Sequence, residues 1–116
     1  HIKVTGNRGN WFAAASDDGR QIPVLWKHQY NYKEMKITTD WLANGRDVTK
    51  SKREALRNYY ENPEVIPKEV ILAEATDQNI RPHDRKRYIC CFSVKVLSTH
   101  PEIELEVVSK EFNCVN

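Results

Sequence analysis

The stretch NWFAAASDDGRQIPVLW, residues 10 to 26, consists of two apolar runs on either side of a turn-forming pair. Asp18-Gly19 between apolar runs is a strong signal for a β-hairpin, because a type I′ turn requires positive φ at both central positions. With these two residues as the loop, Trp11 faces Trp26 across the strands. The same face carries the pairs Ala13 with Val24 and Ala15 with Ile22. The sequence therefore predicts two indole rings side by side above a floor of small side chains.

Length and composition place limits on the rest of the fold. A chain of 116 residues is large enough for one core, so we expect a single domain over residues 1–116. It begins at His1, which suggests a domain excised from a longer protein. Three cysteines give no disulfide framework and favour a reducing compartment, the nucleus or the cytoplasm. No apolar run is long enough for a membrane span, and no signal peptide is visible, so no membrane partner is expected.

Four further segments predict strands. Residues 33–39 alternate, and residues 68–75 form a short apolar run that fits a strand buried on both faces. Residues 88–97 and 102–108 predict a hairpin, with Ile103, Leu105 and Val107 pointing inward. Cys90 and Cys91 are adjacent on its first strand and so point to opposite faces.

One segment predicts a helix, starting at the capping box from Ser51 to Glu54. The apolar stripe that follows is Ala55, Leu56, Tyr59 and Tyr60. Asn62-Pro63 ends the helix, because a residue before proline is pushed out of the α region. The expected fold is α+β: a small, strongly bent antiparallel sheet or barrel of five to six strands with one inserted helix. An open sheet backed by the helix is the competing architecture.

The usual catalytic and metal-binding signatures are missing. The sequence has no Gly-rich phosphate loop, no H-E-x-x-H, no G-x-S-x-G and no pair of C-x-x-C motifs. Its histidines and cysteines are too dispersed to give the spacing of a zinc site. We therefore expect no enzyme activity, no metal and no cofactor.

Aromatic residues, in contrast, cluster early in the chain and include all its tryptophans: Trp11, Trp26, Tyr30, Tyr32 and Trp41. One interpretation is that they fill the core, since aromatic side chains bury large areas. The other is that they form an aromatic cage, because ring faces attract a methylated ammonium that makes few hydrogen bonds.

The order GNWFAAASDDGRQIPVLW, together with the aromatics that follow it, resembles the first strands of Tudor and chromo-barrel domains, the royal family, over residues 9–41. This resemblance implies recognition of methylated lysine or arginine in histone or other nuclear protein tails. It places Trp11, Trp26, Tyr30, Tyr32 and Trp41 in the cage. The segment from Leu42 to Lys68 is an insertion relative to that family, and Asp40 and Glu34 are the candidates for the acidic residue that often closes such a cage.

Charge distribution suggests an alternative, a nucleic-acid-binding module. The net charge of +2 is small, but basic residues gather on the predicted helix and in the loop 81–87. These residues would grip phosphates while exposed aromatics stack on DNA or RNA bases. They are Lys50, Lys52, Arg53, Arg57, Arg81, Arg85, Lys86 and Arg87. They also fit an ordinary solvated surface. We rank a non-enzymatic module that binds a protein tail slightly above one that binds nucleic acid.

Overall fold

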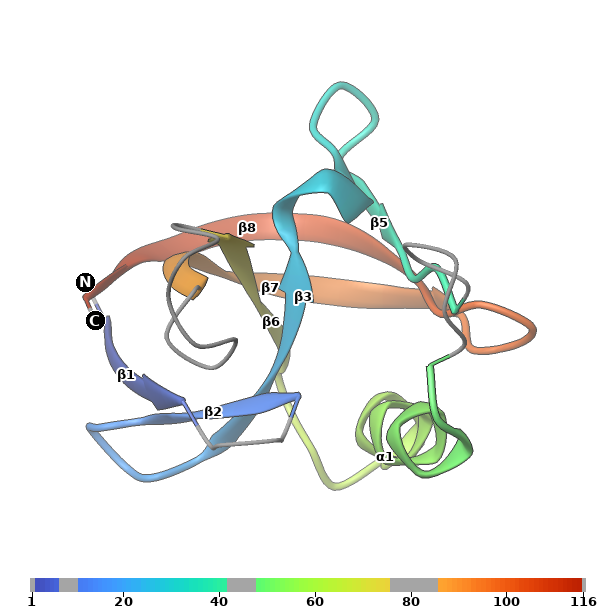
Figure 1. The fold of residues 1–116 in the computed structure, drawn as a ribbon, viewed down its shortest axis with the longest axis horizontal. Helices are drawn as coiled ribbons and strands as arrows, with labels where there is room; N and C mark the ends of the chain where they lie inside the picture. Colours follow the sequence, from blue (N-terminus) through green and yellow to red (C-terminus); the bar gives the residue numbers. More distant parts are fainter. Residues whose placement is uncertain (1, 7–10, 42–47, 76–85, 116) are drawn as a thin grey trace.

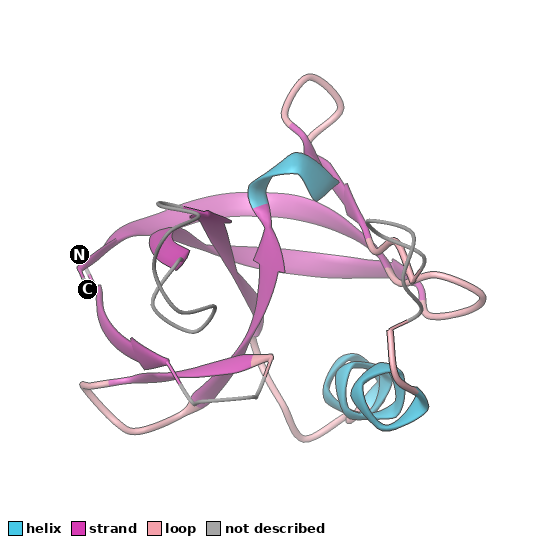
Figure 2. Cartoon of the chain, in the orientation of Figure 1, coloured by secondary structure: helices cyan, strands magenta, loops and turns pink. Residues whose placement is uncertain are grey.

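A computed structural model describes residues 2–6, 11–41, 48–75 and 86–115. Strands dominate it, with one α-helix and one 3₁₀ turn (Figures 1 and 2). In chain order the elements are β1 (Ile2–Gly6), β2 (Phe12–Ala15), β3 (Gln21–Trp26), η1 (Lys27–Gln29), β4 (Tyr30–Asn31), β5 (Lys36–Thr38), α1 (Lys50–Glu61), β6 (Lys68–Ala75), β7 (Lys86–Ser98) and β8 (Glu104–Val115).

These strands form one mixed sheet of eight strands in the order β1-β2-β3-β6-β7-β8-β5-β4. The prediction of a small antiparallel sheet or barrel of five to six strands is therefore wrong. β3 and β6 are parallel, because the chain passes through α1 between them and returns in the same direction. β1 also pairs with β8 at two positions, which brings the chain ends together (Figure 1). β5 and β4 continue the sheet beyond β8, and the eight-stranded sheet as a whole is not closed into a barrel.

The predicted hairpin exists as β2 and β3, but its register differs from the prediction. Ala13 pairs with Ile22, and the Trp11 carbonyl accepts a hydrogen bond of 2.7 Å from the Val24 amide. The turn has four loop residues, 16–19, rather than two, because Ala15 N donates to Arg20 O at 3.0 Å. Trp11 therefore lies opposite Val24, and the two indoles do not stand side by side.

The helix α1 ends at Glu61, with Asn62 as its C-cap before Pro63, as predicted, but it begins differently. Its N-cap is Thr49, whose side chain accepts from the Lys52 amide, so the expected capping box at Ser51 is wrong. Of the expected apolar stripe, Leu56 and Tyr60 are buried and Tyr59 is half-buried. Ala55 is exposed, so the face of α1 that packs on the sheet is narrower than predicted.

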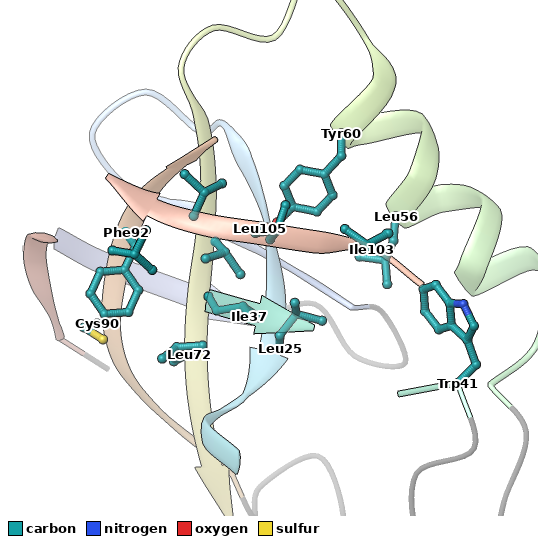
Figure 3. Close-up of a cluster of buried hydrophobic side chains, with 13 residues drawn as sticks. Leu25, Ile37, Trp41, Leu56, Tyr60, Leu72, Cys90, Phe92, Ile103 and Leu105 are labelled. Atoms are coloured by element: carbon teal, nitrogen blue, oxygen red, sulfur yellow. The ribbon is translucent and has the colours of Figure 1, made fainter. Parts of the chain in front are cut away.

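Two cores lie on opposite faces of β6, which confirms the expected strand buried on both sides. The helix-side core joins β3, β5, β6, β7 and β8 to α1 and includes Leu25, Leu56, Leu72, Phe92 and Leu105 (Figure 3). The β1-side core includes Ile2, Ala13, Ile22, Ile71 and Cys91.

The strand β7 divides its side chains between these cores. Cys90 belongs to the helix-side core and Cys91 to the β1-side core, as the expected alternation requires. The pairing of β6 with β7 shifts register near Ile89, so Tyr88 joins the β1-side core and not the face of Cys90.

Candidate functional site

A pocket of about 800 Å³ opens where β3 passes into η1, at one end of the helix-side core. We call it the aromatic pocket because Trp26, Tyr30, Tyr32 and Phe92 are among its lining residues. The strand ends and η1 supply its walls, and β6 and β7 supply its floor. Its lining residues are Trp26, Lys27, His28, Tyr30, Tyr32, Leu72, Ala73, Glu74, Ile89, Cys90 and Phe92.

The floor of the aromatic pocket is the surface of the helix-side core. Leu72, Cys90 and Phe92 are almost fully buried and still line the pocket. Tyr30 lies opposite Ile37 in the ladder of β4 and β5, which turns its ring toward this core. The ring is tilted against Phe92 with centroids 5.2 Å apart. Burial raises the pKa of Tyr30, with a smaller contribution from Cys90, so the phenol stays neutral at physiological pH.

Two aromatic side chains form the walls. Trp26 ends β3 and is half-buried, and its backbone amide donates to Gln29 Oε1 at 2.9 Å, which closes η1 behind it. Tyr32 follows β4 and is 72% exposed. The Tyr32 ring is therefore open to a ligand, whereas the half-buried Trp26 also packs against the β1-side core.

One carboxylate lines the same pocket. Glu74 lies near the end of β6 and is partly exposed. Its oxygens meet Lys27 Nζ at 3.7 Å and the Arg87 guanidinium. Both partners are well exposed, so each pair contributes little to stability.

The other two predicted cage residues lie elsewhere. Trp41 is only 6% exposed, and its Nε1 donates to the Pro101 carbonyl at 2.6 Å. Figure 3 shows it beside the helix, at the opposite end of the core from Phe92. Trp11 packs against the helix-side core, with Lys52 Nζ 5.6 Å from its ring centroid. The structure thus brings together Trp26, Tyr30 and Tyr32 and leaves Trp11 and Trp41 outside the pocket.

The acidic candidates from the sequence are also elsewhere. Glu34 lies in the turn after β4 and Asp40 after β5, and neither lines the aromatic pocket. Sequence reasoning missed Glu74 and Phe92. The position of Glu74 near the end of an apolar strand was a usable signal, because polar side chains at strand ends often line binding sites.

The basic residues proposed for nucleic acid are mostly engaged in internal contacts. Arg53 Nε donates to Val48 O at 3.0 Å, and Arg57 donates to Thr99 O and Pro101 O at 2.9 and 2.7 Å. Both guanidinium groups also lie 5.5 Å from the Trp41 ring centroid. Lys50 lies 3.9 Å from Glu54. Arg81, Arg85 and the side chain of Lys86 lie outside the described residues.

No family model, curated protein or solved structure matches this chain. Within the described ranges, no three His, Cys, Asp or Glu side chains lie close enough together to hold a metal ion. Over the same ranges, no helix has the length and apolar character needed to cross a membrane.

Proposed function

We propose that the protein is a non-enzymatic binding module that receives a methylated lysine or arginine side chain of a protein tail in the aromatic pocket. The observation that carries the proposal is that Trp26, Tyr30 and Tyr32 line one pocket together with the carboxylate of Glu74. Ring faces attract a cation that has lost its hydration, and a nearby carboxylate adds to this attraction. Such ligands occur in the tails of histones and of other chromatin- or RNA-associated proteins in the nucleus or cytoplasm.

The volume and exposure of the pocket agree with this ligand. About 800 Å³ holds a long side chain and part of its backbone. Lys27 and Arg87 already share the charge of Glu74, so a ligand cation must compete with them. Because exposed ion pairs are worth about 0–1 kcal/mol, this competition weakens binding only modestly.

Titration of matched tail peptides by calorimetry tests the proposal. The peptides carry unmodified lysine, trimethyllysine or the uncharged tert-butyl analogue of trimethyllysine at one position. We expect the trimethyllysine peptide to bind about fivefold to thirtyfold more tightly than the uncharged analogue, which corresponds to about 1–2 kcal/mol of cation–π attraction. Equal affinity for the charged and uncharged forms, or no binding of any peptide, would overturn it.

Substitutions at exposed positions locate the binding site without risk to the fold. Tyr32→Ala removes one wall of the pocket and should weaken trimethyllysine binding about fivefold or more. Met35→Ala is the matched control, because Met35 is 46% exposed on the same turn and does not line the pocket. An equal effect of the two substitutions would place the ligand elsewhere.

One observation keeps nucleic acid as a second candidate. Lys27 lines the aromatic pocket and Arg87 is bound to its carboxylate, so a stacked base would find a phosphate partner nearby. Lys27→Gln separates the two ligands. It should strengthen methylated-peptide binding by releasing Glu74 and weaken oligonucleotide binding by removing a cation, while Lys3→Gln on β1 changes neither. Oligonucleotide binding should also fall steeply with salt.

A further inference from the structure

A second hollow of about 660 Å³ lies beside the aromatic pocket. Both are lined by His28, Tyr30 and Tyr32, so only η1 and β4 separate them. The second hollow is otherwise polar, with Asn31, Lys36, Thr38 and Glu104 among its lining residues.

The two hollows lie on opposite faces of the sheet at β4. Tyr30 is opposite the buried Ile37, and Asn31 is opposite the exposed Lys36. Successive side chains of a strand point to opposite faces, so Tyr30 faces the aromatic pocket and Asn31 faces the second hollow. β4 is the last strand in the order of the described sheet, so a ligand can cross its outer edge from one hollow to the other.

Among the strand residues that line the second hollow, Lys36 has a charged residue directly opposite it and Glu104 has none. Lys36 is opposite Glu106, and Glu106 is opposite Lys95 on the other side, so charges in this row alternate.

Glu104, in contrast, has the neutral Thr38 on one side and Ser98 on the other. Lys33 and Glu34, which also line the hollow, are consecutive and of opposite charge. Within the described part of the chain Glu104 forms no ion pair, so its carboxylate is available to a cation from outside.

We propose that the second hollow binds an unmodified lysine or arginine side chain next to the methylated residue of the same tail, with Glu104 as its ion-pair partner. This inference rests on the proposed function of the aromatic pocket. An extended tail that crosses the edge of β4 sends consecutive side chains to opposite faces, so the basic residue lies directly before or after the methylated one. The recognised ligand is then a pair of adjacent basic residues, only one of them methylated.

A double-mutant cycle tests this pairing. Trimethyllysine peptides carry arginine or alanine directly before or after the modified residue, and each is titrated into the wild type, Glu104→Gln and the control Glu64→Gln. Glu64 is exposed and lines neither hollow, and its substitution changes the net charge equally. At one of the two positions, arginine should bind about twofold to fivefold more tightly than alanine in the wild type and in Glu64→Gln. That preference should vanish in Glu104→Gln and shrink with added salt.

Each outcome separates this inference from the proposed function. If trimethyllysine peptides bind but arginine gives no advantage at either position, the inference fails and the aromatic pocket stands. If the arginine advantage survives Glu104→Gln, the basic residue binds elsewhere and the inference fails. Absence of binding by every peptide overturns the proposed function and, with it, the inference.

Discussion

Glu69 carries a buried charge that Arg20 neutralises from the turn between β2 and β3. The Glu69 side chain is 9% exposed, and its two oxygens lie 2.8 and 3.2 Å from Arg20 Nε and Nη2. Glu69 raises the pKa of Arg20. The same guanidinium binds Asp17 and Asp18, so this ion pair holds the turn against β6.

Glu69→Gln should lower the free energy of unfolding by about 1.5 kcal/mol, because a charge-assisted hydrogen bond is lost while Arg20, which is 32% exposed, keeps Asp17 and Asp18 as partners. Urea denaturation measures this value. Asp17→Asn removes an exposed partner of the same guanidinium, and we expect it to cost less than about 1 kcal/mol. Equal losses from the two substitutions would show that the burial of Glu69 does not add to the free energy of unfolding.

Because of Tyr59 and Tyr60, the free energy of unfolding depends on pH in the alkaline range. Burial raises the pKa of Tyr59 to about 12 and that of Tyr60 well above its usual value. An unfolded tyrosine ionises near pH 10, at about its reference pKa. Between about pH 10 and 12 the unfolded state therefore releases protons that the folded state keeps, so the free energy of unfolding falls as pH rises. Below about pH 10 this contribution to stability is fully present.

Tyr60→Phe should therefore make the loss of stability above pH 10 shallower than in the wild type. It should also cost about 1 kcal/mol at neutral pH, because Tyr60 Oη donates to the Glu69 carbonyl at 2.9 Å. Urea titrations at several pH values measure both effects. Tyr32→Phe, at an exposed tyrosine, is the control, and an identical pH slope in all three proteins would contradict the prediction.

At the scale of elements, the start of α1 depends on Thr49 rather than on Ser51. Thr49 Oγ1 accepts from the Lys52 amide at 3.4 Å, a long bond that suggests a modest contribution. We expect Thr49→Ala to lower the free energy of unfolding by about 0.5–1 kcal/mol. Ser51→Ala should lower the free energy of unfolding by less than this. If urea denaturation instead shows the larger loss for Ser51→Ala, the N-cap is Ser51, as the sequence predicted.

The hairpin shows which features of the fold the sequence could predict. Alternation correctly placed Ala13, Ile22 and Val24 on one buried face, because a shift of two residues keeps every side chain on its face. It could not select between registers that differ by two. That choice depends on long-range contacts such as Arg20 with Glu69, which no local pattern reveals.

The parallel pairing of β3 with β6 left a weaker signal in the sequence. A strand buried on both faces is typical of parallel sheets, and residues 68–75 were predicted to be buried in this way. The intervening helix could also have served as the crossover that a parallel pair requires. Taken together, these two features could have indicated a mixed sheet instead of the antiparallel sheet that the sequence analysis predicted.

The aromatic pocket was predictable only in part. Trp26, Tyr30 and Tyr32 are close in sequence, and the strand end and η1 keep them close in space. Glu74 and Phe92 reach the same pocket from β6 and β7, so their place depends on the sheet order. Trp11 and Trp41 were grouped with the pocket aromatics because they are close in sequence, but their rings contact Lys52 and Arg53 of α1 instead.

At the scale of the whole molecule, β6 joins the two cores. Ile71 belongs to the β1-side core, whereas the neighbouring Val70 and Leu72 belong to the helix-side core. Loss of either core would expose one face of β6 and disturb its ladder with β7, a strand that also contributes side chains to both cores. The two cores should therefore unfold together, although they lie on opposite sides of one strand.

Truncation of one residue in each core tests this coupling. Ile22 lies in the β1-side core and Leu105 in the helix-side core, and both are fully buried. Ile22→Ala and Leu105→Ala should each lower the free energy of unfolding by about 2–5 kcal/mol, because each leaves a cavity. In both variants, urea unfolding followed by far-UV circular dichroism and by tryptophan fluorescence should give one coincident transition, as expected for a single cooperative unit. Separate transitions in either variant would mean that β6 does not couple the cores and that each side of the sheet folds on its own.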